Sequence, residues 1–255
     1  MYAEERQQAI ADLVGQRGRV SVVDLAHRFD VTTETVRRDL SALERLNLLR
    51  RVHGGAVPAG ALTMMEIGLQ DRDSANTEQK DRIARAALDL LPAAGATVLL
   101  DAGSTTDRLA GRIPRDLELT IFTHAVPIAA RLASYPHVDL HLLPGRVRPA
   151  TQAAVGHATI EAIRQLRADL AFIGTNGISV RHGLSTPDPE EAATKRALVE
   201  SADRVVVLTD ASKVGQERTV RFADLDDIDV LVTDRGIEEA DAKAFEASGL
   251  DVIRA

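Results

Sequence analysis

The sequence contains no cysteine and no tryptophan, and aromatic residues make up only 3% of it. Without cysteine the protein cannot form disulfide bonds, thiolate metal sites or cysteine nucleophiles, and a reducing compartment such as the cytoplasm fits this composition. Because 45% of the residues are hydrophobic, the chain can still build a core, which must consist of leucine, valine, isoleucine and alanine.

Long apolar runs are missing as well. No stretch approaches the ~20 apolar residues that a membrane-spanning helix needs. The first residues, Met1 to Arg6, have no apolar segment behind a basic start, so we expect neither a signal peptide nor a membrane partner. We also expect no metal ion and no cofactor.

The net charge of -7 at pH 7 is unevenly distributed along the chain. Residues 1–57 carry nine basic and eight acidic side chains, whereas the remainder carries 22 basic and 30 acidic ones. The acidic balance argues against indiscriminate coating of nucleic acid. It fits a small DNA-binding segment attached to an acidic domain, and it equally fits an ordinary acidic protein.

The first part of the chain follows the pattern of a helix-turn-helix. The expected elements are helices over 4–15 and 24–29, an extended stretch over 19–22, a turn at Asp30 and Val31, and a third helix capped by Thr32. In the third helix Val36, Leu40 and Leu43 form the apolar stripe, so Arg37 and Arg38 face elsewhere. This layout is typical of a recognition helix, whose N-terminal half enters the major groove of DNA.

A hairpin over 48–57, with its tip at 53–55, predicts a wing beside that helix. The residues expected to contact DNA are Thr32, Thr33, Thr35, Arg37, Arg38, Arg50, Arg51 and His53. The alternative is that Arg37 and Arg38 form a solvated helix face paired with Glu34 and Asp39.

These residues also carry a family resemblance. Arg6, Ile10, Val14 and Thr32, the run from Thr35 to Leu40, and the run from Leu48 to Ala56 resemble the signature of the DeoR family of repressors. One departure is Asn47, where the family usually has glycine; asparagine tolerates the left-handed conformation that such a cap requires. The resemblance implies a winged helix-turn-helix DNA-binding domain over 1–57.

After a small-residue break at Pro58 to Ala61, we expect a linker over 58–76 and a second domain over 77–255. Expected helices are 77–91, 105–112, 126–133, 159–166, 190–202 and 238–248, and expected strands are 97–100, 119–122, 138–143, 170–173, 204–209, 218–222, 230–233 and 252–253. Short strands that are apolar on both faces and alternate with helices indicate a Rossmann-like, mainly parallel α/β sheet.

Ligands of such sheets bind beyond the carboxyl ends of the strands. The first loop there, Asp101 to Thr106, is neither a Walker loop nor a GxGxxG motif, so it does not point to ATP or NAD. Its hydroxyls open a helix, a position that suits an anion. Later loops add Asn176, Asp210 and Lys213. This mixture suits a phosphorylated sugar, with amides, hydroxyls and a cation for phosphate.

These loops are similar to the effector domain of the same family, which is related in fold to ribose-5-phosphate isomerase and glucosamine-6-phosphate deaminase. The similarity covers residues 77–215, with His124 and Pro144 departing from the family pattern. Together with Asn176, the residues expected to bind the effector are Asp101, Gly103, Ser104, Thr105, Thr106, Thr123, Gly145, Gly177, Lys195, Asp210 and Lys213. Simpler interpretations are helix caps at the first loop and a Lys195–Glu191 helix pair.

The sequence therefore predicts a repressor of a sugar uptake and catabolism operon, not an enzyme, that forms a dimer or tetramer and leaves its operator when a sugar phosphate binds. Residues 1–6 and 31–40 resemble actinobacterial fructose-operon regulators, which puts fructose 1-phosphate first among effectors. Other hexose phosphates, tagatose phosphates and glycerol 3-phosphate stay open. The rival interpretation is a sugar-phosphate isomerase or deaminase fused to a DNA-binding head, with Asp188, Glu190, Glu191 or Asp210 as base.

Overall fold

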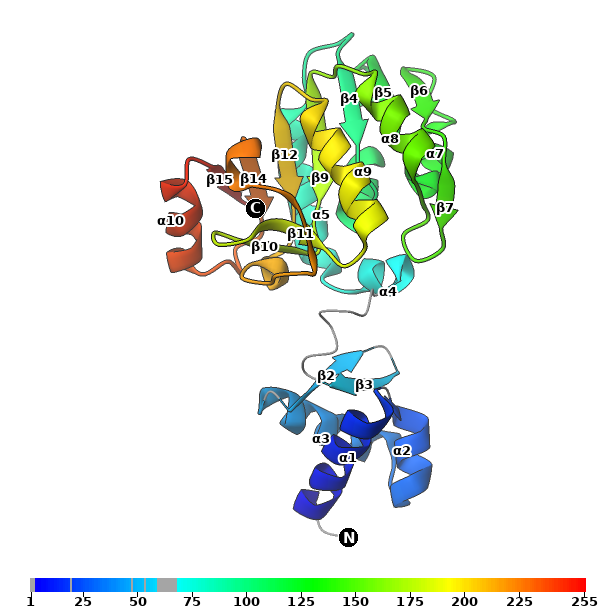
Figure 1. Cartoon of the computed structure of the whole chain (residues 1–255), viewed down its shortest axis with the longest axis vertical. Helices are drawn as coiled ribbons and strands as arrows, with labels where there is room; N and C mark the ends of the chain where they lie inside the picture. Colours follow the sequence, from blue (N-terminus) through cyan, green and yellow to red (C-terminus); the bar gives the residue numbers. More distant parts are fainter. Residues whose placement is uncertain (1–2, 19, 47, 53, 59–67) are drawn as a thin grey trace. The chain divides into compact units, whose positions relative to one another are not determined.

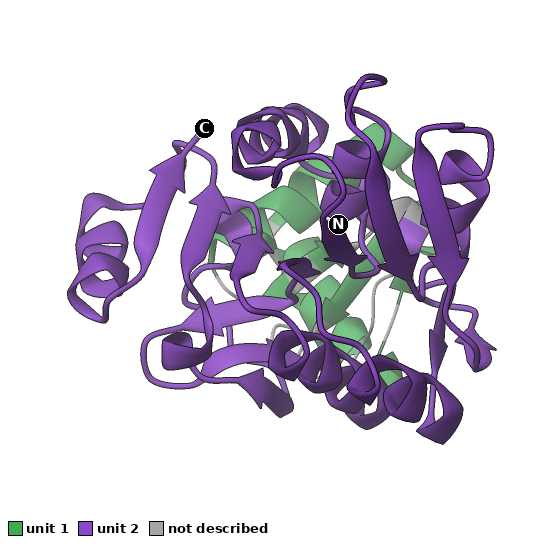
Figure 2. Cartoon of the chain, turned by 90° about the horizontal axis from the view of Figure 1, so that it is seen from above, with its two compact units in different colours: residues 1–66 green, residues 67–255 purple. Residues whose placement is uncertain are grey.

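The computed structural model describes residues 3–18, 20–46, 48–52, 54–58 and 68–255. The chain divides into two compact units, residues 1–66 and 67–255, which are coloured separately in Figure 2. Of the expected linker over 58–76, residues 59–67 lie outside the described residues, and residues 68–76 fall within the second unit, where they include a short helix.

The first unit consists of three helices and a small antiparallel sheet. Its elements are α1 (Ala3–Arg17), β1 (Val20–Ser21), α2 (Val22–Phe29), α3 (Thr33–Arg45), β2 (Leu49–Val52) and β3 (Gly55–Pro58), and the strand order is β1-β3-β2. Ile10, Leu25, Val36, Leu40 and Leu49 are buried in its core. The close approach of β1 and β3 requires Gly55, because a Cβ there would lie 2.0 Å from the carbonyl oxygen of Val20.

Local capping explains where these helices begin and end. α2 begins at Val22, two residues before the expected start, because the Ser21 hydroxyl accepts a hydrogen bond from the Asp24 amide at 3.0 Å. Asp30 ends α2 in the left-handed conformation, with φ of 51°, which confirms the predicted turn. The Thr32 hydroxyl accepts from the Thr35 amide at 3.1 Å, as the sequence predicted.

The second unit is built on a seven-stranded parallel sheet of order β15-β14-β12-β9-β4-β5-β6. Its strands are β4 (Thr97–Leu100), β5 (Leu119–Thr123), β6 (Val138–Leu142), β9 (Leu170–Gly174), β12 (Val205–Leu208), β14 (Val230–Thr233) and β15 (Asp251–Arg254). All six strand pairs are parallel. The mainly parallel α/β architecture predicted from the sequence is therefore confirmed.

Helices cover both faces of this sheet, with α8 and α9 in front of it and α5 behind it in Figure 1. One core packs against α8, α9 and α10, and the other against α5, α6 and α7. The helices and helical turns are α4 (Leu69–Ser74), α5 (Thr77–Ala86), η2 (Ala87–Leu90), α6 (Ser104–Ala110), α7 (Val126–Leu132), α8 (His157–Arg164), α9 (Pro189–Glu200), η3 (Ala211–Lys213), η4 (Leu225–Asp227) and α10 (Glu239–Ala247). Among the described residues, no helix combines the length and the apolarity needed to span a bilayer.

The strand order contains a switch point between β4 and β9. From β4 the chain moves outward through β5 and β6, and it then returns to β9 on the opposite side of β4 before continuing to β12. The loops after β4 and β9 therefore diverge at neighbouring strands, which is where open α/β sheets form ligand crevices.

Short antiparallel strands were not predicted in the second unit, except near β13 (Val220–Ala223). They are β7 (Arg146–Arg148), which pairs with β8 (Ala153–Val155), and β10 (Gly177–Ser179) with β11 (Gly183–Thr186), which pairs in turn with β13. Strands of three or four residues carry too little alternation to be recognised from sequence. Only their contacts with the rest of the unit define them.

Candidate functional site

A cation-rich pocket lies at the switch point. The loops after β4, β9 and β12 line it, together with side chains from α4, α5 and α9. The lining residues are Arg72, Lys80, Ala102, Gly103, Ser104, Thr105, Thr106, Gly174, Thr175, Asn176, Lys195, Leu208, Thr209, Asp210 and Lys213. Eight of the residues predicted to bind the effector are thus brought together: Gly103, Ser104, Thr105, Thr106, Asn176, Lys195, Asp210 and Lys213.

Arg72 and Lys80 were missed by the sequence analysis. The side chain of Lys80 reaches back beyond the start of α5 and donates hydrogen bonds to the carbonyl oxygens of Arg72 in α4 and, at 2.6 Å, of Ala75. Both residues lie before β4, in a segment interpreted only as linker and helix. One feature of the sequence indicated that Lys80 is buried. This lysine lies on the same side of the helix as the apolar residues Ile83 and Ala84.

The cations of the pocket are incompletely solvated. Burial lowers the pKa of Lys80 to about 8, because the nearby carboxylate of Asp210 only partly offsets the loss of water and the charge of Lys213 adds to it. Burial also lowers the pKa of Lys213, against the opposing effect of Asp210, and Arg72 lowers it further. An anion in this pocket would stabilise the charged forms of Lys80 and Lys213 and so raise both pKa values.

Two residues that line the pocket each have a buried side-chain atom without a hydrogen-bond partner among the described residues. These atoms are Nε of Arg72 and Oγ1 of Thr209. Leaving a buried donor unpaired costs about 1–3 kcal/mol, and more when the group is charged. Both atoms can donate to an anionic oxygen, so the pocket lacks an acceptor that a ligand could supply.

Asp101 is completely buried and organises the loops behind the pocket. Its Oδ2 accepts hydrogen bonds from the Lys195 ammonium and, at 2.8 Å, from the Gly174 amide, while Oδ1 lies 3.0 Å from Nε2 of His124. Burial alone would raise the pKa of Asp101, but the charge of Lys195 and the bond to His124 lower it to about 2. Asp101 therefore stays ionised and holds Lys195 beside the pocket.

Lys195 and His124 complete this buried network. Lys195 contacts Glu191 at 3.7 Å, as the simpler interpretation proposed, but it also donates to the Gly174 carbonyl at 3.0 Å. His124 is fully buried, and Nδ1 of its ring donates to the carbonyl of Ala154 at 2.8 Å. The network joins the loops that follow β4, β5 and β9.

Four residues predicted to bind the effector lie outside the pocket lining: Asp101, Thr123, Gly145 and Gly177. The Thr123 hydroxyl is buried and donates to the Leu100 carbonyl at 2.7 Å. A Cβ on Gly145 would lie 2.0 Å from Oγ1 of Thr159, and one on Gly177 would lie 2.4 Å from the Gln216 carbonyl oxygen. In this structure these residues shape the loops, and a direct contact between any of them and a ligand stays a prediction.

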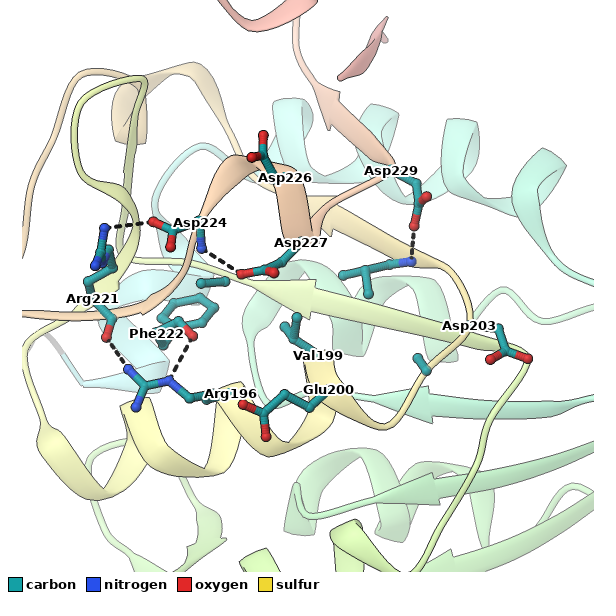
Figure 3. A pocket seen from close by; sticks show the side chains of 13 residues that line it. Arg196, Val199, Glu200, Asp203, Arg221, Phe222, Asp224, Asp226, Asp227 and Asp229 are labelled. Carbon is teal, nitrogen blue, oxygen red and sulfur yellow. Dashed lines mark hydrogen bonds and ion pairs between the residues drawn. The ribbon is translucent and has the colours of Figure 1, made fainter. Parts of the chain in front are cut away.

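A second, larger pocket has the opposite charge. It encloses about 470 Å³, against about 30 Å³ for the cationic pocket, and lies along α9, β13 and η4. Glu200, Asp203, Asp226 and several further aspartates surround it (Figure 3). These carboxylates would repel a phosphate, so size alone does not identify the anion site.

Most of those carboxylates already have a structural role. Asp224 pairs with Arg221 at 2.6 Å, Asp227 accepts from the Asp224 amide at 2.8 Å, and Asp229 accepts from the Val205 amide at 2.7 Å. Over the described ranges of the chain, no group of three or more histidine, aspartate or glutamate residues could hold a metal ion.

The first unit presents a separate surface of exposed polar residues on α3. Val36, Leu40 and Leu43 face the core, whereas the side chains of Arg37 and Arg38 are 57% and 81% exposed. Both arginines lie near Glu34, at 3.6 and 3.7 Å, so the alternative ion pairs exist. Exposed pairs at these distances contribute little to stability and leave both guanidinium groups accessible.

The other predicted DNA contacts lie at the start of α3 and on the wing. Thr32 and Thr33 are exposed, and the Thr35 hydroxyl lies 2.9 Å from that of Thr32. Nη1 of Arg51 donates to the Ser41 hydroxyl at 2.6 Å, which ties β2 to α3. His53 and the side chain of Arg50 lie outside the described residues.

Asp39 does not join the arginines of α3. It is buried and accepts a 2.6 Å hydrogen bond from Nε of Arg6, with Gln7 donating at 2.9 Å. The hydrogen bond that Arg6 donates to Asp39 raises the pKa of Arg6. This pair fastens α1 to α3 and explains why Arg6 accompanies the helix-turn-helix pattern.

The carboxylates considered as catalytic bases are each engaged. Asp188 and Glu191 contact Arg148 at 3.1 and 2.8 Å, and Glu190 forms an ion pair with Arg146. Asp210 lines the cationic pocket, but it accepts hydrogen bonds from Ser212 and, at 2.9 Å, from Asn76. This geometry does not favour the isomerase or deaminase interpretation.

Comparison with known proteins gives one family for both units. The model of the DeoR-like helix-turn-helix domain matches residues 6–59, and that of the DeoR C terminal sensor domain matches residues 75–235. At TM-score 0.41 and 18% identity, ribose 5-phosphate isomerase A from Methanocaldococcus jannaschii covers 55% of this chain and 55% of its own. A likeness this low adds nothing to the functional argument.

Three curated relatives match nearly the whole chain. The transcriptional regulator GlpR of Haloferax volcanii is 34% identical over 99% of this chain and 98% of its own. The regulator FruR of Bacillus subtilis is 34% identical, and the glycerol-3-phosphate regulon repressor of Escherichia coli K12 is 33% identical, each over 92% of both chains. The chain therefore belongs to the DeoR family, as a DNA-binding transcription regulator with a sensor domain and not as an enzyme.

Proposed function

We propose that this regulator represses a sugar uptake and catabolism operon and leaves its operator when a phosphorylated sugar occupies the cationic pocket. The observation that carries the proposal is the pair of unpaired donors, Arg72 Nε and Thr209 Oγ1, beside Lys80 and Lys213. A phosphate supplies acceptor oxygens and negative charge together, which is what this wall of the pocket lacks.

The remaining polar groups suit the rest of a sugar. Asp210 and Asn176 lie on the same wall and can exchange their present partners for sugar hydroxyls. Ser104 and Thr105 begin α6 beside the cations. In this arrangement Asp101 acts indirectly, because it positions Lys195.

Fructose 1-phosphate stays the first effector to test, on the resemblance of residues 1–6 and 31–40 to fructose-operon regulators. Overall similarity does not separate it from glycerol 3-phosphate. FruR of Bacillus subtilis and the Escherichia coli glycerol-3-phosphate regulon repressor are 34% and 33% identical to this chain. The choice among effectors therefore depends on measured binding.

The present pocket is too small for such a ligand, and this supports a coupled movement. Sites for small ligands usually enclose about 300–1,000 Å³, whereas this pocket holds about 30 Å³. Arg72 comes from α4, the first helix of the second unit and the one nearest in sequence to the DNA-binding unit. We propose that the effector binds Arg72 and shifts α4 to enlarge the pocket, and that this movement disfavours the DNA-binding state.

The DNA contacts expected on α3 and the wing belong to this proposal, as do a homo-oligomer and a cytoplasmic location. By linkage, an effector that weakens operator binding must itself bind less tightly to the operator complex, by the same factor. Both affinities can be measured on the purified full chain.

The test combines a thermal-shift panel with operator binding. The panel contains fructose 1-phosphate, other hexose phosphates, tagatose phosphates and glycerol 3-phosphate, with the unphosphorylated sugars as controls. At 100 times its Kd an effector adds about 2.7 kcal/mol to the stability of the free protein. The same compound must release fluorescent operator DNA in an anisotropy titration. Stabilisation by the unphosphorylated sugars alone, or retention of the operator at saturating effector, would overturn the proposal.

A further inference from the structure

The outer edge of β6 is a free sheet edge. β6 is the last strand of the seven-stranded sheet, and among the described strands it pairs with β5 alone. Asp139, His141 and Leu142 on this strand are exposed, and Leu142 exposes 55% of its surface. Long edge strands in monomeric proteins are usually protected by proline, bulges or covering loops, because they invite pairing with another chain.

The direction of the backbone groups is fixed by the pairing with β5. The His137 carbonyl accepts from the Leu119 amide at 3.2 Å, and the Leu143 amide donates to the Thr123 carbonyl at 2.9 Å. Backbone groups alternate along a strand, so odd-numbered residues face β5 and even-numbered residues face outward. The carbonyl of Val138 and both backbone groups of Leu140 and Leu142 therefore point to the open edge.

The side chains of β6 are self-complementary about Leu140. In an antiparallel pair of two β6 strands centred there, Leu140 faces its own copy and Val138 faces Leu142. Asp139 then faces His141 twice, so each acidic side chain meets an imidazole of the second copy in addition to the one of its own chain, whose Nε2 lies 3.3 Å from Asp139 Oδ2. An imidazole N–H can donate a hydrogen bond to a facing carboxylate, whereas two carboxylates in facing positions destabilise a strand pair.

A pairing shifted by one residue loses both advantages. Moving the centre by one residue to Asp139 brings two aspartates face to face, and moving it to His141 brings two histidines together. Either shift also directs outward the residues whose backbone groups already bond to β5. Of these three registers, the one centred on Leu140 combines the outward backbone direction with facing acidic and imidazole side chains.

We propose that two copies of this chain dimerise by antiparallel pairing of β6 with β6, which joins their sheets into one. Leu140 with Leu140, and Val138 with Leu142, form hydrogen-bonded pairs and make about four backbone hydrogen bonds. Asp139 and His141 of the second copy form the closer, non-hydrogen-bonded pair. The exposed side chain of Leu142 is covered by Val138 of the second copy.

Single cysteines test the register directly, because the natural chain has no cysteine. In a non-hydrogen-bonded pair the Cα atoms are about 4.5 Å apart, within disulfide range. Full-length Asp139→Cys and His141→Cys proteins should form a disulfide-linked dimer when they are mixed and oxidised. Each protein alone should not, because its cysteines are diagonal neighbours about 7–8 Å apart. Equal crosslinking in the mixture and the separate samples would overturn this register.

A second pair of variants tests the edge itself. Proline at 142 removes an outward N–H without touching the bonds to β5, so Leu142→Pro should raise the dimer dissociation constant at least tenfold. Leu142→Ala keeps that donor and is the matched control, with circular dichroism reporting the fold. The readout is light scattering over nanomolar to micromolar protein. A monomeric wild type, or an unchanged Leu142→Pro assembly, would overturn the proposal.

Discussion

The two units hold their cations in opposite ways. On α3 the arginine side chains are more than half exposed, whereas Lys80 and Lys195 in the sensor are 3% and 2% exposed. Exposed arginines keep their water and can exchange counterions along a polyanion such as DNA. The buried lysines have lost that water, so they gain most from a compact anion that enters the pocket.

Burial also separates the ion pairs, and the first unit contains pairs of both kinds. Glu34 meets its arginines at 3.6 and 3.7 Å in solvent, while Asp101 and Asp39 bind their cations in the interior. Exposed pairs are worth at most about 1 kcal/mol, and removing one partner of a buried pair typically costs about 3–5 kcal/mol. Substitutions in the buried pairs should therefore cost stability, whereas substitutions of the exposed residues should mainly affect binding.

The largest effect is expected from Asp101→Ala. It leaves the Lys195 ammonium buried without its carboxylate and should destabilise the sensor unit by about 3–5 kcal/mol. Glu34→Ala in the first unit is the matched comparison, with an expected change within about 1 kcal/mol. Urea unfolding followed by circular dichroism measures both. Equal losses of unfolding free energy in the two variants would contradict the expected difference between buried and exposed ion pairs.

Lys213→Ala should separate effector binding from DNA binding. Loss of one charged hydrogen bond, worth about 1.5–3 kcal/mol, should weaken the best sugar phosphate by roughly 10- to 150-fold. Operator affinity should stay unchanged, so the repressor becomes hard to induce. Lys243→Ala, on the exposed face of α10, is the control. Calorimetry that finds wild-type effector affinity in Lys213→Ala would exclude this residue from the site.

Arg37→Ala and Arg38→Ala test the exposed surface. If either arginine reads a guanine, its loss should relax specificity at one base pair by about 1–3 kcal/mol; if it holds a phosphate, binding should weaken evenly across sequences. Glu34→Gln frees both arginines and should not weaken binding. Anisotropy with a set of operator variants distinguishes these outcomes, and unchanged affinity in both alanine variants would remove α3 from the interface.

The smallest expected effect is a pH dependence confined to the buried site. Lys80 has a pKa of about 8 without ligand, and a bound anion raises it. Below pH 8 Lys80 is already charged, but above pH 8 binding must take up a proton, so effector affinity falls by up to about tenfold per pH unit. Lys80→Arg should flatten the profile, because arginine stays charged. A wild-type Kd that is constant from pH 7 to 9.5 would contradict this.

Local chemistry made much of the first unit predictable. The Thr32 cap, the turn at Asp30 and the apolar stripe of α3 depend on residues within a few positions of each other, and all three appear as expected. The start of α2 was placed two residues late because the capping role of Ser21 was not recognised. The buried Arg6–Asp39 pair joins residues 33 positions apart, which no local pattern reveals.

Only part of the candidate site could be predicted from local sequence patterns. The glycine- and hydroxyl-rich loops after β4, β9 and β12 could be found because each directly follows an apolar strand. Arg72 and Lys80 could not, because neither follows a strand. Their place in the pocket depends on how α4 and α5 pack beside the sheet.

By itself the sequence determined the elements, their alternation and therefore a parallel sheet, since these follow from spacing and composition over short stretches. It also placed the polar loops at one sheet edge. Only the tertiary structure decided that the Asp101 carboxylate is bound to Lys195 and His124. It also decided that β5 and β6 lie away from the pocket and that β6 has a free edge. Those outcomes depend on strand order and burial, which arise from contacts between residues far apart in the chain.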